Sequence, residues 1–264
     1  MRVCFASLVV LACSATSLFA GAVSVNLGSA DSYSVLAGTT VTNTGSTTIT
    51  GDLGVWSGSS ITGFPPGIVT GGTINAANTA AMNAQHDLTL AYNFAAGEAC
   101  SNTLSGDLGG LTLTPGVYCF GSTAALTGTL TLNALGDPNA VFLFQIGSSL
   151  TTASNSSVVI TNPGTGDSVF WQVGSSATLG TNSAFAGNIL ALTSITANTG
   201  ATINCGRALA QNGAVTLDTN HIAIDQVGCE ATAPTSSVPE PASVLLSGFG
   251  LLGLLLVVRR WKTA

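Results

Sequence analysis

Threonine and asparagine recur at a fixed spacing in this chain and could build a surface of neutral hydroxyl, amide and methyl groups. Segments of the form Thr-x-x-Thr or Thr-x-x-Asn begin at residues 152, 178, 196 and 216, and a related segment begins at residue 44. The residues that the pattern selects are Thr44, Thr47, Thr152, Asn155, Thr178, Thr181, Thr196, Thr199, Thr216 and Thr219. Residues 168–206 contain no Asp, Glu, Lys or Arg. Such a surface offers hydrogen bonds and apolar contacts without charge.

Residues suited to catalysis are scarce between the two ends of the chain. That part holds two histidines, His86 and His221, one arginine and no lysine. A lyase or a triad hydrolase would have few groups to work with, so we expect no enzymatic activity. We expect His86 on the solvent side of a helix and His221 at a corner. Asp52 and Asp107 lie in Gly-Asp-Leu-Gly segments typical of Asx turns, so no metal or other cofactor is expected.

The charge distribution excludes a nucleic-acid partner. All eleven acidic residues, from Asp31 to Glu240, lie between basic ends, and Arg207 is the single basic residue among them. This middle part therefore carries about 1 − 11 = −10 charges. Phosphate binding needs clustered Lys or Arg, which this part lacks.

Both ends of the chain read as targeting segments. Arg2, an apolar stretch and small residues at "SLFAGA" predict a signal peptide over residues 1–22. At the other end, an apolar run over residues 242–258 is followed by Arg259, Arg260 and Lys262. The run is near the lower limit of about 17 residues for a transmembrane helix, with its basic end in the cytoplasm. On the residues alone this is a tail anchor.

Residues 23–230 suit one domain, followed by a linker over residues 231–237. The domain and the short tail beyond it retain four cysteines, at positions 100, 119, 205 and 229. An even number in an exported chain favours two disulfides. Three pairings are possible, and we predict the local ones, Cys100 with Cys119 and Cys205 with Cys229. A metal site is the alternative, but no CxxC spacing supports it.

Most of the domain alternates Thr or Ser with Val, Ile or Leu between Gly, Asn and Pro turns, which predicts short strands. The segments "VFLFQI" (141–146) and "VFWQV" (169–173) are apolar on both sides, as expected of strands covered on both faces. Residues 75–99 differ, because Ala or Leu recurs there in steps of three and four. This period predicts an amphipathic helix packed along the strands.

Successive Thr segments of the later half start 26, 18 and 20 residues apart, a spacing that fits one coil of an irregular β-solenoid. The expected fold class is therefore mainly β with one long helix. Strand alternation adds a constraint: residues three apart cannot both project from one unbroken strand, so one Thr of each pair must lie at a bend.

Several long blocks of the chain resemble the ice-binding-like family of microbial antifreeze proteins. They include "VTNTGSTTITGDLGV", "LTPGVYCF", "GDPNAVFLFQIGSSLTTASNS" and "VFWQVGSSATLGTNSAFAGNILALTSITANTGATINCGRALAQNGAVTLDTN". The resemblance implies a discontinuous right-handed β-solenoid of triangular section, with a flat outer sheet that binds ice. The family pattern Thr-Ala/Gly-x-Thr/Asn fits the segments at 44–47, 152–155 and 196–199. Leu179 and Leu217 depart from it, and an outward Leu would roughen a flat face.

The C-terminus resembles the PEP-CTERM sorting signal, here residues 238–264 with Pro239, Glu240 and Pro241 before the apolar run. The resemblance implies a precursor held transiently in the inner membrane, cleavage by an exosortase-type protease, and a secreted or cell-surface product.

Stacked coils would place like residues about 4.8 Å apart across strands and about 6.7 Å apart along a strand, comparable to oxygen spacings in ice. We therefore expect an exported, monomeric protein whose partner is the ice surface. The alternative is a matrix or adhesion protein of the exopolysaccharide layer without ice activity. Trp56, followed by "SGSS", is the place where such a protein would stack on a sugar.

Overall fold

The structure is a computed structural model that describes residues 23–166 and 168–224. These residues form a mainly β solenoid with one α-helix, as the sequence predicts. The predicted signal peptide, the linker, Cys229 and the C-terminal sorting segment with its apolar run lie outside the described residues. Within the described part, no helix combines the length and apolarity needed to cross a membrane.

Each coil contributes strands to three faces, which we name A, B and C, and every strand pairing is parallel. Face A contains the first halves of β8 (Asn102–Asp107) and β10 (Gly116–Leu126), then β12 (Val141–Ile146), β15 (Ser168–Val173), β18 (Asn188–Ala191), β21 (Ala208–Ala210), β1 (Tyr33–Ala37), β4 (Asp52–Val55) and β7 (Ile74–Ala76). Face B contains the second halves of β8 and β10, then β13 (Leu150–Thr152), β16 (Ala177–Leu179), β19 (Ile195–Ala197), β22 (Val215–Leu217), β2 (Thr40–Asn43) and β5 (Ser60–Thr62). Face C contains β9 (Thr112–Leu113), β11 (Thr129–Asn133), β14 (Ser157–Thr161), β17 (Ala184–Ala186), β20 (Thr202–Asn204), β23 (His221–Ala223), β3 (Thr48–Thr50) and β6 (Ile68–Thr70).

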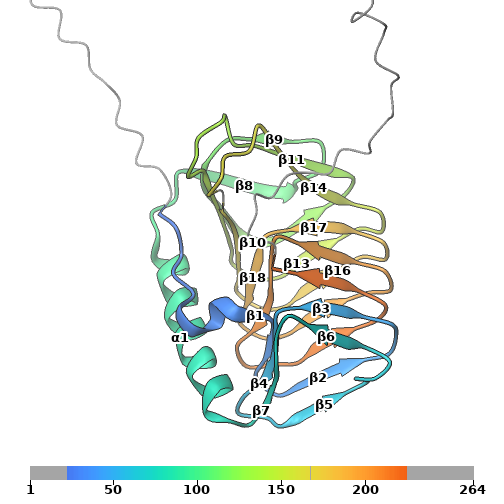
Figure 1. Cartoon of the computed structure of the whole chain (residues 1–264). Coiled ribbons are helices and arrows are strands. Elements are labelled where there is room, and N and C mark those ends of the chain that lie inside the picture. The colour runs from blue at the N-terminus through green and yellow to red at the C-terminus, as the bar shows by residue number, and fades with distance from the viewer. Residues whose placement is uncertain (1–22, 167, 225–264) are drawn as a thin grey trace, which may run out of the picture. The chain divides into compact units, whose positions relative to one another are not determined.

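The stacking order does not follow the chain. The coil β21–β23 pairs with β1–β3, so the N-terminal coils stack beyond the last C-terminal coil. We call this junction the seam. Helix α1 (Thr79–Gly97) then carries the chain back along face A, from the end with β7 toward the end with β8 (Figure 1). Its 19 residues span about 28 Å at 1.5 Å per residue.

The predicted helix is confirmed, with a later start than residue 75. Residues 74–76 continue the sheet as β7, and Asn78 caps the helix by accepting the backbone N–H of Ala81 at 2.9 Å. The alternating Ala and Leu positions from Ala81 to Ala95 are buried against face A. Ala77 stands outside the helix, because its φ of 51° is left-handed. The small side chains let the helix axis approach the sheet closely.

The two strands predicted to be covered on both sides, β12 and β15, confirm that expectation. Leu143 and Phe170 face α1, whereas Phe144 and Trp171 point into the solenoid and stack with ring centroids 3.9 Å apart. The aromatic stack continues to Tyr118 on one side and to the tilted ring of Phe185 on the other. Coils that lie in register therefore stack their large side chains as well as their backbones.

The predicted Cys100–Cys119 disulfide is confirmed, with its two Cα atoms 5.9 Å apart. It fastens the segment after α1 to face A. The predicted partner of Cys205, Cys229, lies outside the described residues, so the second pairing stays a prediction.

Arg207, the single basic residue in the described part of the chain, lies buried beside the seam. Its Nη2 group contacts the Oδ1 atom of Asp31 at 2.7 Å, and its Nε and Nη2 groups both donate to the backbone carbonyl of that residue. Its Nη1 group donates to Asn188 Oδ1 at 2.7 Å. Asp31 lies in the 3₁₀ segment η1 (Gly28–Ser32), just before β1, so Arg207 links the C-terminal coils to the start of the N-terminal ones.

We predict that Arg207→Met lowers the free energy of unfolding by about 3 kcal/mol, because buried acceptors lose a charged donor. Urea unfolding measures this change. Asp31→Asn is the control and should cost less than about 1 kcal/mol, since that side chain is 60% exposed and the carbonyl acceptor remains. Equal losses for the two variants would contradict this account of the seam.

Candidate functional site

Face B presents one uninterrupted column of threonines, one from each of six neighbouring strands. The strand register aligns Thr151, Thr178, Thr196, Thr216, Thr42 and Thr62. These pairings show no register shift, in contrast to those between β1 and β4 and between β8 and β10. At about 4.8 Å per strand the column is about 24 Å long.

Strand alternation turns these threonines outward. Ile195 and Ala197, the neighbours of Thr196, are 0% and 2% exposed, and the neighbours of the other column threonines are also buried except at Thr62, in the last strand, where Ile61 and Gly63 are half-buried. Leu179 and Leu217 also lie on the inner side and are fully buried. The expectation that these leucines roughen the face is therefore wrong, because they occupy the inward position after each column threonine.

Within the described residues, none of the six column hydroxyls makes a hydrogen bond to another protein atom. The threonine side chain is stiff at χ1, so each hydroxyl and methyl group is held in place by the strand that carries it. The column therefore offers a row of fixed donors, acceptors and methyl groups to solvent.

A second column lies beside the first and consists of the residues two positions before each column threonine, which either begin a strand or directly precede one and so lie on the same side as the threonine. Its members are Ser149, Ser176, Ser194, Ala214, Thr40 and Ser60, all at least partly exposed. The Oγ atoms of Ser176 and Ser194 accept the backbone N–H groups of Ser194 and Ala214, each at 3.3 Å. These bonds run from coil to coil. No side chain in either column carries a charge.

Three predicted residues, Thr178, Thr196 and Thr216, lie in the exposed column. Thr152 and Thr47 are instead buried, at 3% and 0% exposure, and cannot present their hydroxyls to a surface. Thr152 Oγ1 accepts the backbone N–H of Gly180 at 2.9 Å. The pattern selected Thr152 and not its neighbour Thr151 because Asn155 follows Thr152 by three residues, whereas the residue three after Thr151 is Ser154.

The remaining predicted residues lie at the corner between faces B and C. Asn155 and Thr181 are exposed there, and the backbone N–H of Asn155 donates to the Thr181 carbonyl at 2.9 Å. The hydroxyls of Thr199 and Thr219 donate to the carboxylate of Asp218, and the nearby Thr44 hydroxyl donates to the Leu217 carbonyl at 3.4 Å. The geometric expectation that one threonine of each pair lies at a bend is therefore correct for these coils.

The corner hydroxyls lower the pKa of Asp218, the bond from Thr199 contributing most. Asp218 follows Thr216 by two residues, so its carboxylate stands at the edge of the threonine column. Asp218 therefore places a negative charge at the margin of face B, where hydroxyl groups of the protein donate hydrogen bonds to it.

Sequence reasoning missed Thr42, Thr62 and Thr151. A search for period-two segments could have found them, since "TVT" at 40–42 and "SIT" at 60–62 show the outward–inward–outward pattern of a strand. The three-residue spacing obscured this signal because its second member belongs to the corner.

Face C also bears hydroxyl groups, but its surface is mixed. One register column runs through Thr129, Ser157, Ala184, Thr202, His221, Thr48 and Ile68. Some hydroxyls on face C form hydrogen bonds with one another. Thr129 pairs with Ser157 at 2.9 Å, and Thr50 pairs with Thr70 at 3.3 Å. Ile68 is 52% exposed. This face therefore repeats neither residue type nor hydrogen-bonding state.

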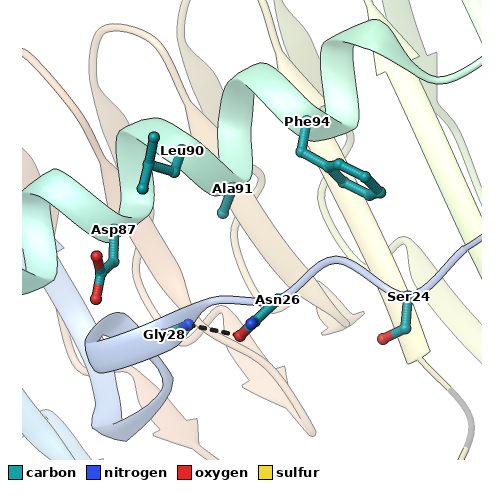
Figure 2. Close-up of a pocket in the computed structure, with 7 residues that line it drawn as sticks. All are labelled: Ser24, Asn26, Gly28, Asp87, Leu90, Ala91 and Phe94. Atoms are coloured by element: carbon teal, nitrogen blue, oxygen red, sulfur yellow. Dashed lines mark hydrogen bonds between the residues drawn. The ribbon is translucent and has the colours of Figure 1, made fainter.

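A groove of about 500 Å³ lies on the face A side of the molecule, between α1 and the N-terminal segment (Figure 2). Leu90, Ala91 and Phe94 supply its apolar side, and Asp87 is its titratable group. The Asp87 carboxylate accepts both the backbone N–H of Ser29, at 2.8 Å, and the Ser29 hydroxyl. This acid therefore has a structural role, holding η1 against the helix.

A parallel β-solenoid with a helix along one face and an in-register, uncharged threonine column on another defines the structural class. Comparison with known proteins then shows the family. A model described as ice-binding-like matches residues 35–223, and the chain belongs to this family. A second model, the PEP-CTERM protein-sorting motif, matches residues 237–260.

Individual relatives agree with the family. An ice-binding protein of Nostoc sp. (strain HG1) is 58% identical over 238 residues, 89% of this chain and 86% of that protein. The crystal structure of an ice-binding protein from an Antarctic biological consortium has a TM-score of 0.73 and 48% identity, covering 76% of this chain and 91% of that one. The structure of an ice-binding protein from Antarctomyces psychrotrophicus has a TM-score of 0.71 and 41% identity, covering 76% and 98%.

We predict that stability is level near neutral pH and falls in acid. Hydrogen bonds lower the pKa of Asp87, Asp107 and Asp218, the main donors being Ser29, the Gly109 backbone and Thr199. Their contribution is complete above the unfolded-state pKa of about 3.9 and is lost as the pH falls through the lower folded-state values. Thermal unfolding from pH 7 to pH 2 measures it. Asp87→Asn should make the decline shallower; a decline that starts above pH 6 would contradict the assignment.

Proposed function

We propose that this protein adsorbs to ice through face B, with the six column threonines and the serine-rich second column as its contact surface. The observation that carries the proposal is the unbroken register of Thr151, Thr178, Thr196, Thr216, Thr42 and Thr62, whose hydroxyls have no partner within the described protein. The family and the named relatives support ice as the ligand.

The mechanism follows from the chemistry of the column. Methyl groups disfavour ordinary hydration, while fixed hydroxyls hold a layer of water in positions that repeat every 4.8 Å or so along the stack. This layer can merge with the ice lattice. A charged side chain would order its own hydration shell, so the absence of charge in both columns suits the contact.

Adsorption depends on many weak contacts. One hydroxyl contributes about 0.5 to 1.5 kcal/mol net, so no single threonine holds the protein on ice. The contacts act together because the sheet fixes them in advance, which reduces the entropy lost on binding. A bulky side chain at the centre should therefore do more harm than the loss of one hydroxyl, because it lifts the whole face away from the ice.

The alternative function, adhesion in an exopolysaccharide layer, receives less support. Its proposed contact residue, Trp56, is only partly exposed and lies between β4 and β5, outside the threonine column. The relatives named above are ice-binding proteins.

We predict that Thr196→Tyr lowers ice-recrystallisation inhibition by about tenfold or more while the unfolding temperature stays within a few degrees, because Thr196 lies outside the core near the middle of the column. A dilution series in a recrystallisation assay and thermal hysteresis provide the measurements.

Thr202→Tyr is the matched control. Thr202 lies on the same coil, is partly exposed and faces outward from face C. It should leave ice activity within about twofold of the wild-type value. Loss of activity in Thr202→Tyr but not in Thr196→Tyr would move the contact to face C. Purified protein that neither shapes ice nor inhibits recrystallisation, yet binds polysaccharide, would favour adhesion.

The sorting motif supports an exported or cell-surface protein. We propose further that residues 1–22 act as a signal peptide, that residues 242–258 hold the precursor in the inner membrane, and that an exosortase-type protease processes it near Pro239–Pro241. Arg259 and Arg260 would keep the tail on the cytoplasmic side.

Replacing Pro239, Glu240 and Pro241 together with alanine should leave an unprocessed precursor in the membrane fraction of a host that carries an exosortase. Immunoblots of membrane and medium fractions measure its size and place. Unchanged processing would show that the cleavage signal lies elsewhere.

A further inference from the structure

The threonine column crosses the seam between two distant parts of the chain. Thr42 and Thr62 come from the N-terminal coils, whereas Thr151, Thr178, Thr196 and Thr216 come from the C-terminal coils. Thr42 and Thr216 are direct partners across the seam but lie far apart in sequence. The full length of the column therefore depends on how the N-terminal coils dock.

A buried polar network lies beside the column at this point. Asn43, Thr47 and Asn220 are 5%, 0% and 3% exposed, and they form a chain of hydrogen bonds across the seam. The backbone N–H of Asn220 donates to Thr47 Oγ1 at 3.0 Å, and Thr47 Oγ1 donates to Asn43 Oδ1 at 2.6 Å. We call these three residues the seam network.

The seam network reaches four successive coils. Asn43 Nδ2 donates to the Gly63 carbonyl at 2.8 Å, in the coil that carries Thr62. On the other side, Asn220 Nδ2 donates to the carbonyls of Asn198 and Ala201, both at 2.9 Å, in the coil that carries Thr196. Asn220 Oδ1 accepts the backbone N–H of Asp218 at 2.6 Å. The amide of Asn220 thus has a partner for its oxygen and for both its hydrogens.

Each anchor point is close to a column threonine. Asn43 and Gly63 directly follow Thr42 and Thr62, and Asn198 follows Thr196 by two residues. Moving any of these backbone segments would shift the neighbouring hydroxyl relative to the rest of the column. Because the bonds are buried, breaking one leaves a polar group unsatisfied and favours displacement of the coil.

We propose that Asn43, Thr47 and Asn220 are positioning residues for ice binding: they lock the N-terminal coils in register with the C-terminal coils and so join the two parts of the threonine column into one level surface. This inference rests on the proposed function of face B. Thr47 is buried and cannot contact ice, so its role in this proposal is to hold in place the coils that carry the contact surface.

The test compares Thr47→Val with Thr47→Ser. Valine keeps the shape of threonine but removes the hydroxyl, which deprives the Asn220 N–H of its acceptor and leaves Asn43 Oδ1 with the longer bond from the Gly45 N–H at 3.4 Å; serine keeps the hydroxyl. We expect Thr47→Val to need about fivefold more protein for the same recrystallisation inhibition, because the column loses two of its threonines from the common plane. Thr47→Ser should stay within about twofold of the wild-type value.

A matched control separates positioning from loss of stability. Tyr118→Phe also deletes a buried hydroxyl, one that donates to the Thr114 carbonyl, but it lies far from the seam network. It should lower the unfolding temperature without changing ice activity in the fully folded protein at 4 °C. Amide hydrogen exchange should speed up in β2 and β5 of Thr47→Val, and not in β16.

Unchanged ice activity in folded Thr47→Val would overturn the proposal, and so would equal losses of activity in Thr47→Val and Tyr118→Phe. If Thr47→Val does not fold, Asn43→Ser replaces it, since serine keeps an acceptor for Thr47 but loses the donor to Gly63. If the wild-type protein has no ice activity, the proposed function of face B fails, whereas the exchange measurement still decides whether the network holds the seam.

Discussion

In-register parallel stacking of the coils is the constraint on which the rest of this structure depends. Each strand inside the stack forms backbone hydrogen bonds with a neighbour on both sides, so a shift of one residue would turn its buried side chains to solvent. Register thereby fixes three things at once: the aromatic stack inside, the apolar side of face A under α1, and the outward threonines of face B. The register that core packing requires therefore also produces a regular array of threonines on the surface.

The three faces share one backbone arrangement but differ in the side chains that point outward. Face A needs apolar residues on both sides because α1 covers it, and its strands carry Leu143, Phe170 and Leu190 outward. Face C tolerates His221 and Ile68 among its outward residues. Face B repeats threonine, leaves the six column hydroxyls without partners among the described residues, and places Asp218 at its margin. Uniformity, rather than hydroxyl content alone, distinguishes the proposed ice-contact surface.

The discontinuous order of the coils makes polar interactions inside the solenoid important. An apolar core contact is tolerant of small displacements, whereas a hydrogen bond between buried groups demands a defined distance and angle. Arg207 supplies such bonds on the face A side of the seam, and Asn43, Thr47 and Asn220 supply them at the corner of faces B and C. These groups specify how two distant parts of one chain meet.

The sequence by itself determined the fold class, because period-two alternation, the three-and-four spacing of Ala and Leu, and the coil-length steps between Thr segments are local signals. It also predicted the Cys100–Cys119 disulfide, the helix against face A, and a threonine surface that includes Thr178, Thr196 and Thr216. Burial of Thr47 and Thr152, and the inclusion of Thr42, Thr62 and Thr151 in the column, were decided only by the tertiary structure. The physical reason is that a side chain's direction depends on where its strand ends and its corner begins, and that limit is set by pairing with a neighbouring coil distant in sequence.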